Sequence, residues 1–242
     1  MKSQKVSVDW LKEHLHDSNL RIIDCQFVFG EPEEGRRLYS LSHLPGAVFF
    51  DLEEDLAGPR AEHGGKHPLP DVAQLADKLG RAGIDQDTVV VAYDSQGGGM
   101  VARFWWLMHY LGHQQTYLLD GGLTRWTELG LPVTTEVPPT PAAKTFTPHV
   151  QHDMVVNIDR VRQALQNKDA TLIDSREEKR YLAIEEPLYP VAGHIPGALN
   201  HYWKHSLNED GTWKSVEEQK ERFAGIDKDS EVIAYCGSGI TA

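Results

Sequence analysis

The sequence has 242 residues, of which 40% are hydrophobic and 25% charged, and its formal net charge at pH 7 is −12. This acidic balance argues against a general nucleic-acid surface, which needs Lys and Arg to neutralise phosphates. No apolar run is long enough to cross a membrane, and the N-terminus MKSQKVSVDW lacks the apolar core of a signal peptide. The two cysteines, Cys25 and Cys236, lie far apart, so we expect a reducing cytoplasm rather than a disulfide scaffold.

The first half of the chain alternates between helical and strand patterns. Residues 52–70, which include HGGKHPLP, lack such a pattern and are predicted to form an irregular surface loop. In chain order we expect a helix at 6–16, strands at 20–24 and 48–50, a helix from Asp71 to about Leu79, a strand at 89–93, a helix at 100–111, a strand at 117–119 and a helix at 123–129.

The pattern starts again after a proline-rich segment, 135–152, which reads as an interdomain linker. VNIDRVRQAL matches VSVDWLKEHL, TLID matches RIID, HIPGA matches HLPGA, and VIAYC matches VVAYD. An ordered series of matches at similar spacing indicates a duplicated domain. We therefore predict an N-terminal domain over 1–134 and a C-terminal domain over 153–242.

Strands that alternate with helices predict an α/β fold, with a parallel sheet flanked by helices in each half. Ligands of such folds bind at the carboxyl ends of the strands. Cys236 and Asp94 each follow a strand at the same position of the repeat. Because Asp94 cannot do thiol chemistry, we expect the first domain to be catalytically inactive and to contribute walls to a site at the domain interface.

The repeat is shorter in the second half. In the first half a helix, a strand and a second helix follow the glycine loop as far as Pro132, whereas the second half stops at Ala242. If the repeat is faithful, about 35 to 40 residues, roughly one βα unit, are expected beyond this point. We therefore expect a C-terminally truncated second domain, without the helix whose N-terminal dipole would help to hold a thiolate.

The stretch VIAYCGSGITA carries the clearest chemical signal. Gly237 and Gly239 have no Cβ, so the backbone N–H groups around them can turn inward as a nest, and Ser238 and Thr241 can add hydroxyl donors. Converging donors favour the thiolate, which is the nucleophilic form of cysteine. The alternative is a buried structural cysteine followed by an ordinary turn, and the residues alone do not decide between the two.

The duplicated strands ending in Asp, the HxPGA segments and the terminal CGSGITA closely resemble the tandem-domain rhodanese family of sulfurtransferases, over essentially the whole chain. The loop is similar to the 3-mercaptopyruvate branch, because the thiosulfate branch carries basic residues where this chain has Gly237 and Ser238. The resemblance implies that Cys236 takes a sulfane sulfur from 3-mercaptopyruvate or thiosulfate as a persulfide. The sulfur then passes to cyanide, a small thiol or thioredoxin, and no metal or organic cofactor is required.

The resemblance also implies roles for individual residues. Arg180 aligns with the family arginine that holds the anionic group of the donor, and a guanidinium fits a carboxylate or sulfonate through two hydrogen bonds. Ser238 aligns with a loop serine proposed to help activate the donor. The backbone from Gly237 to Thr241, which includes Gly239 and Ile240, is expected to stabilise the anion.

Two histidines occupy the HxPGA segments. His43 aligns with a first-domain histidine proposed to act on the donor across the interface, with Glu33 or Glu34 as its acidic partner. A structural histidine at the entrance of a strand is the alternative for His43, and it is the expectation for His194.

The resemblance leaves the donor open, and the sequence also bears on other functions. The mercaptopyruvate branch usually has a second arginine where this chain reads EPLY at 186–189, so thiosulfate or a broad donor range stays possible. A cysteine phosphatase would need an arginine at residue 242, which is alanine. A catalytically inactive binding or sensing module is the alternative from another class. There is no CxxC motif, and we expect His63 and His67 to face solvent and Cys25 to pack at a strand end.

Overall fold

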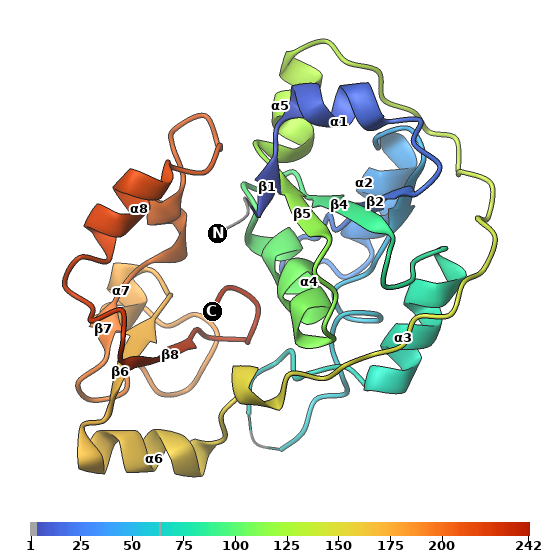
Figure 1. The fold of residues 1–242 in the computed structure, drawn as a ribbon. Coiled ribbons are helices and arrows are strands. Elements are labelled where there is room, and N and C mark those ends of the chain that lie inside the picture. The colour runs from blue at the N-terminus through green and yellow to red at the C-terminus, as the bar shows by residue number, and fades with distance from the viewer. Residues whose placement is uncertain (1–3, 63) are drawn as a thin grey trace.

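The computed structural model describes residues 4–62 and 64–242 and contains two separate sheets whose paired strands are all parallel (Figure 1). The strand orders are β1-β5-β4-β2-β3 and β7-β6-β8, which confirms the predicted α/β fold. In chain order the elements are β1 Lys5–Val6, α1 Val8–His14, β2 Leu20–Asp24, α2 Glu34–Leu41, β3 Ala47–Phe49, α3 Val72–Arg81, β4 Val89–Tyr93, α4 Gly99–Tyr110, β5 Thr116–Leu119, α5 Gly122–Glu128, η1 His152–Met154, α6 Ile158–Asn167, β6 Ala170–Asp174, α7 Glu178–Tyr181, β7 Leu199–Asn200, η2 Trp203–Ser206, α8 Val216–Arg222 and β8 Glu231–Tyr235.

Helices cover both faces of the first sheet (Figure 1). Residues of α3 and α4 form one apolar core with the sheet, and residues of α1 and α5 form a second core with its other face. The apolar run VVVAY of β4 is therefore buried on both sides, as is typical of a central parallel strand. Side chains cap the N-termini of α1 and α3, because Ser7 accepts from the N–H of Trp10 and Asp71 from that of Gln74.

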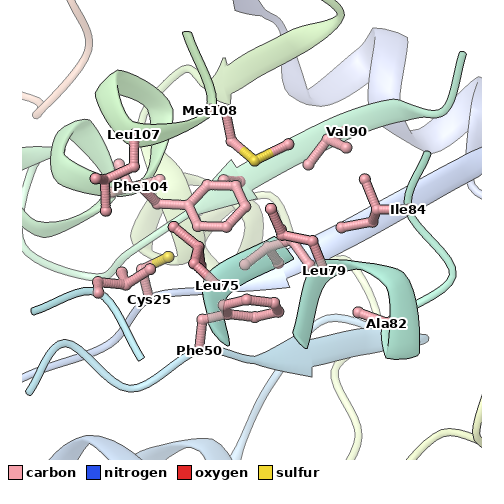
Figure 2. Packing of buried hydrophobic residues seen from close by; sticks show 14 of the residues in the cluster. Cys25, Phe50, Leu75, Leu79, Ala82, Ile84, Val90, Phe104, Leu107 and Met108 are labelled. Atoms are coloured by element: carbon pink, nitrogen blue, oxygen red, sulfur yellow. The ribbon is translucent and has the colours of Figure 1, made fainter. Parts of the chain in front are cut away.

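Cys25 lies in the first of these cores, beside Leu75, Phe50 and Phe104 (Figure 2). Its side chain is buried, and this burial raises the pKa of the thiol well above its ordinary value. Since the thiolate is the reactive form, a buried neutral thiol is inert. The prediction that Cys25 packs rather than reacts is confirmed.

The duplication extends to the pairing register. β2 pairs with β4 from Leu20 opposite Val89 to Asp24 opposite Tyr93. β6 pairs with β8 in the same way, and its last pair is Asp174 opposite Tyr235. The hydroxyl of each of these tyrosines accepts the backbone N–H of the residue that follows the histidine of an HxPGA segment, at 3.0 Å in both halves. Asp94 and Cys236 therefore occupy equivalent positions, each directly after the carboxyl end of its strand.

The two halves meet at the glycine loop between β4 and α4. A Cβ on Gly98 would lie 2.7 Å from the ring of Trp213, and one on Gly99 would lie 2.8 Å from the ring of Trp203. Gly98 also has φ = +97°, which disfavours other residues. These glycines allow side chains of the second half to approach the N-terminus of α4, and the loop after β8 extends toward the same helix (Figure 1).

The segment that connects the two sheets packs along the first half. Thr134 forms an antiparallel bridge with His43, the N–H of Lys144 donates to the carbonyl of Gly80, and Phe146 is buried in the core beneath α4. The N–H of His149 donates to the carbonyl of Leu111 at 2.8 Å. The connecting segment is therefore fixed to the surface of the first half by backbone hydrogen bonds and one buried side chain. The domain boundaries 1–134, 135–152 and 153–242 stay a prediction.

The structure contains two first-half elements that the sequence pattern did not predict. The first is β1, which covers only two residues and exists because it pairs with β5. The second is α2, whose charged sequence hides a narrow buried face formed by Gly35 and Tyr39. Among the described residues, no helix combines the length and the apolar character needed to cross a bilayer.

The second sheet is less covered than the first. Val232 of β8 is 44% exposed, whereas its counterpart Val90 of β4 is fully buried between α3, α4 and the sheet. The second sheet has strands equivalent to β2, β3 and β4. The truncation of the second domain stays a prediction.

A buried carboxyl group at the end of β2 makes stability depend on pH. Asp24 accepts hydrogen bonds from Tyr93 Oη at 2.6 Å and from the backbone and side chain of Gln26. Burial nevertheless raises the pKa of Asp24 to about 6, although these hydrogen bonds act in the opposite direction. The folded protein therefore retains a proton on Asp24 at a pH where the unfolded chain has released it.

We predict that this group stabilises the fold below about pH 4 and that its contribution is lost as pH rises through 6. Relative to Asp24→Asn, the free energy of unfolding of the wild type should fall across this window by on the order of 1–3 kcal/mol. Urea denaturation at pH 4, 5, 6 and 7 measures it. A constant difference between the two proteins would contradict the prediction.

Candidate active site

Cys236 lies at the carboxyl end of β8, where the edge of the second sheet faces the first half. The side chain is partly exposed, and the backbone N–H of Gly239 points at its sulfur with an N–Sγ distance of 3.2 Å. Gly239 has φ = +95°, a conformation that turns the chain back toward the cysteine. The loop therefore directs one backbone N–H at the thiol, and its role as a nest for an anion stays a prediction.

A pocket of about 610 Å³ opens in front of Cys236, and we call it the cysteine pocket. Both halves of the chain contribute to it, so it lies at the interface. It brings together four of the predicted site residues, Cys236, Ser238, Thr241 and Arg180, with the backbone of Gly237. Its other lining residues are Phe29, Gln96 and Met100 of the first half and Arg176, Glu177, Pro187, Leu188, Tyr202, Trp203 and Lys204 of the second.

Arg180 reaches the cysteine loop from α7. A Cβ on Gly237 would lie 2.9 Å from its Nη2 atom, so the guanidinium rests directly on the loop. Nε and Nη2 of Arg180 form a two-pronged ion pair with Glu186, at 3.2 Å and 2.8 Å. Nη1 lies outside this ion pair. Arg180 is thus placed to meet an anion that enters the cysteine pocket.

Glu186 is a site residue that the sequence pattern did not single out. Its side chain is only 4% exposed and is shared between Arg180 and Arg176, which in turn binds Asp174 at the end of β6. Burial raises the pKa of Glu186, but the hydrogen bond from Arg180 and the two positive charges outweigh burial and hold it below its usual value. The carboxylate therefore fixes both arginines at the strand ends.

The rest of the loop is held by its backbone and by one apolar anchor. Tyr189 Oη donates to the carbonyl of Gly237 at 2.7 Å. The backbone of Ile240 was expected to help to stabilise the anion; its side chain is 3% exposed and lies in the first-half core with Met100 and Phe104. Only the backbone of Ile240 is available to a ligand, because its apolar side chain gains more from burial.

The structure does not bring His43 to the cysteine pocket. His43 is fully buried, its Nδ1 and Nε2 face the carbonyl oxygens of Tyr39 and Glu136 at 2.7 and 3.1 Å, and its ring stacks on Tyr39. His194 repeats this arrangement on Tyr181, with the ring centroids 3.7 Å apart. His43 is therefore a structural histidine at the entrance of a strand, which was the alternative interpretation of this residue.

The expected acidic partners of His43 lie elsewhere. Glu34 forms an exposed two-pronged ion pair with Arg37, and Glu33 precedes the first turn of α2 without capping it. His67 was expected to face solvent, but it is 5% exposed and lies beside Glu53. His63 lies outside the described residues. Within the described part of the chain no group of three His, Cys, Asp or Glu side chains is arranged to hold a metal ion.

Asp94, the counterpart of Cys236, shows what the loop offers to an anion. Its carboxylate is 1% exposed and accepts four backbone N–H groups at 2.9–3.0 Å, from Gln96, Gly98, Met100 and Val101. The last two lie in the first turn of α4, whose dipole also favours a negative charge. At Cys236 one backbone N–H, that of Gly239, is directed at the group in the equivalent position.

We predict that Asp94→Asn destabilises the protein by about 2–4 kcal/mol, because the amide nitrogen cannot accept the N–H groups that one carboxylate oxygen now accepts. Chemical denaturation followed by circular dichroism measures it. The matched control is Asp77→Asn, which removes an exposed ion pair with Arg81 on α3 and should change stability little. Equal effects of the two substitutions would contradict a cradle at Asp94.

Comparison with known proteins identifies the family to which the chain belongs. The model of the rhodanese-like domain matches the chain twice, over residues 7–129 and 157–242. The chain belongs to the rhodanese family. The two matches lie on the two sheets, and the cysteine loop ends the second.

Three similar proteins illustrate the relationship. The probable 3-mercaptopyruvate sulfurtransferase of Pseudomonas aeruginosa is 39% identical over 246 residues, which cover 99% of this chain and 86% of the relative. The thiosulfate sulfurtransferase of Bos taurus is 35% identical over 250 residues, which cover 98% and 82%. The crystal structure of SseA from Escherichia coli, described as a 3-mercaptopyruvate sulfotransferase, superposes with a TM-score of 0.87 at 31% identity and covers 99% of this chain and 90% of that one. These relatives confirm the predicted enzyme class, a sulfurtransferase.

Proposed function

We propose that this rhodanese-family enzyme moves a sulfane sulfur from 3-mercaptopyruvate or thiosulfate to a thiophilic acceptor through a persulfide on Cys236. The N–H of Gly239 directed at Sγ, at the inner end of a pocket that also holds Arg180, is the observation that carries the proposal. It supports a nucleophilic sulfur with a cation placed for the charged end of a donor.

The first step is attack of the Cys236 thiolate on the outer sulfur of the donor. A new S–S bond forms, and either the C–S bond of 3-mercaptopyruvate or the S–S bond of thiosulfate breaks. The leaving group keeps the electron pair, as the enolate of pyruvate, which then takes a proton, or as sulfite. The backbone N–H groups after Cys236 stabilise the negative charge on sulfur before and after the transfer.

The second step regenerates the enzyme. Cyanide, a small thiol or the thiolate of thioredoxin attacks the outer sulfur of the persulfide, the S–S bond breaks, and its electron pair returns to Cys236. The partial exposure of Cys236 at this pocket supports access of a second substrate after the first has left. We place the reaction in the cytoplasm, because both cysteines are free and a reducing compartment keeps them so.

The choice between the donors rests on the cations of the cysteine pocket. Leu188 occupies the stretch where the mercaptopyruvate branch usually has a second arginine, and it lines the pocket with Pro187. Lys204, across the same pocket, supplies a positive charge from another element. This arrangement supports anionic donors of more than one shape, so both must be tested.

The intact mass of the protein after exposure to each donor tests the proposal. We expect a gain of one sulfur atom that disappears on addition of cyanide and does not occur in Cys236→Ser. Full transfer activity in Cys236→Ser would overturn the proposal. Absence of the mass gain with both donors would instead favour a binding or sensing module without turnover.

We predict that Arg180→Gln raises the KM for the donor by about 10-fold or more and changes kcat less, because charge-assisted hydrogen bonds to the donor are lost. Steady-state kinetics with each donor at saturating cyanide measures it. The matched control is Lys179→Gln, since the neighbouring Lys179 pairs with Glu185 on the exposed side of α7. An unchanged KM in Arg180→Gln would show that the donor anion binds elsewhere.

A further inference from the structure

Arg103 is a buried arginine that the proposed mechanism has not used. It lies in the middle of α4, in the half of the protein that has no nucleophile, and its side chain is almost fully buried. Its guanidinium donates to the carbonyls of Leu56 at 3.1 Å and Pro68 at 2.9 Å within the first half. A third hydrogen bond, from Nη1 to the carbonyl of Gly239 at 2.9 Å, crosses to the cysteine loop.

The partners of Arg103 are carbonyl oxygens, and no described carboxylate forms an ion pair with it. Burial lowers the pKa of this guanidinium to about 10, and attraction to Cys236 acts in the opposite direction. Arg103 therefore remains charged at neutral pH, and its positive charge attracts the ionised form of the Cys236 side chain. A buried cation without a carboxylate partner is costly, so its retention calls for a role.

The peptide groups of the loop explain how a carbonyl contact reaches the sulfur. In a planar trans peptide the C=O and N–H bonds point in opposite directions. The carbonyl of Ser238 accepts the backbone N–H of His67 at 2.9 Å, and the N–H of the same peptide group, on Gly239, points at Sγ of Cys236. The next peptide group has its carbonyl, that of Gly239, on Arg103, so its N–H, on Ile240, points away from Arg103.

In the first half, the N–H at the position equivalent to Ile240 donates to an anion. By the repeat, Ile240 corresponds to Gly98, whose N–H donates to the carboxylate of Asp94 at 2.9 Å. The first half therefore binds the carbonyls of Ser238 and Gly239 on the outer side of the loop, and the N–H of Gly239 faces the sulfur on its inner side.

Close packing leaves little freedom in this contact. A Cβ on Gly65 would lie 2.7 Å from the carbonyl oxygen of Ser238, and one on Gly239 would lie 3.0 Å from that of His67. Arg103 also donates to His67 and Pro68, so one guanidinium joins the segment around Gly65 to the cysteine loop.

We propose that Arg103 is a positioning residue by which the first domain prepares Cys236 for sulfur transfer. It fixes the Gly239–Ile240 peptide, and with it the loop whose Gly239 N–H faces the sulfur, and it places a buried positive charge that favours the thiolate. The proposal rests on the proposed function, because it assigns a role in the same reaction. It gives the inactive domain a direct part in catalysis.

The test compares Arg103→Met and Arg103→Lys with the wild type, and two properties are measured. The first is the rate of alkylation of Cys236 by iodoacetamide as a function of pH, with Cys236→Ser to subtract any signal from Cys25. The second is the rate of persulfide formation with thiosulfate and with 3-mercaptopyruvate. The other charged or titratable groups around the sulfur are Arg176, Glu177, Arg180, Glu186, Tyr189, Tyr202 and Lys204, with His67 beside Arg103, and all of them are left in place.

In Arg103→Met we expect the midpoint of the alkylation profile to rise by about one pH unit and persulfide formation to slow by roughly 10- to 100-fold. Arg103→Lys should restore the alkylation profile, because the charge is kept, but only part of the rate, because the fork of donors is lost. The matched control is Arg21→Met. Arg21 also binds backbone carbonyls of the first half, but it does so at the N-terminal end of β2, whereas the site lies at the carboxyl ends of the strands. It should leave both properties unchanged.

Wild-type alkylation and persulfide rates in Arg103→Met would overturn the positioning role. If Arg103→Met does not fold, Arg103→Ala is measured with added guanidinium ion at low millimolar concentration, against the same concentration of sodium chloride. Recovery with guanidinium alone supports the proposal, and a folded Arg103→Ala with a wild-type alkylation profile contradicts it. Absence of a persulfide in the wild type would count against the proposed function, whereas the alkylation profiles would still decide the role of Arg103.

Discussion

Backbone N–H groups that converge on one anion at the end of a parallel strand are the feature around which both halves of this chain are built. In the first half the anion is the carboxylate of Asp94, held by four N–H groups and the first turn of α4. In the second half the group at this position is the sulfur of Cys236, with the N–H of Gly239 directed at it. A fixed carboxylate makes a rigid scaffold, whereas a thiolate in the same place makes a nucleophile.

The second loop depends on the first half for its shape. The carbonyls of Ser238 and Gly239 are bound by His67 and Arg103, and Ile240 is inserted in the core beneath α4. The orientation of the Gly239 N–H, which faces the sulfur, is therefore set across the interface. The proposed role of Arg103 would give the first half a part in the reaction.

Local pattern was sufficient for much of the fold and for part of the site. Strongly apolar strands such as β4 and the glycine-rich loop after Cys236 are determined by residues that are adjacent in the sequence, and both were predicted. Glu186 and Arg103 were not, because their partners are brought close only by tertiary structure; Arg103 lies within an apolar helix and binds a loop 136 positions away. His43 was placed at the site by family resemblance, but stacking on Tyr39 and two carbonyl contacts hold it inside the first domain.

The N–H of Gly239 reports most directly on whether the loop after Cys236 is a cradle for a sulfur anion. Its amide resonance is followed by ¹⁵N–¹H nuclear magnetic resonance while one equivalent of thiosulfate or 3-mercaptopyruvate is added and then removed with cyanide. If the persulfide forms in this cradle, the Gly239 resonance should shift on loading, return on discharge and stay unchanged in Cys236→Ser. A Gly239 resonance that does not respond while the protein gains sulfur would show that these N–H groups do not hold the anion.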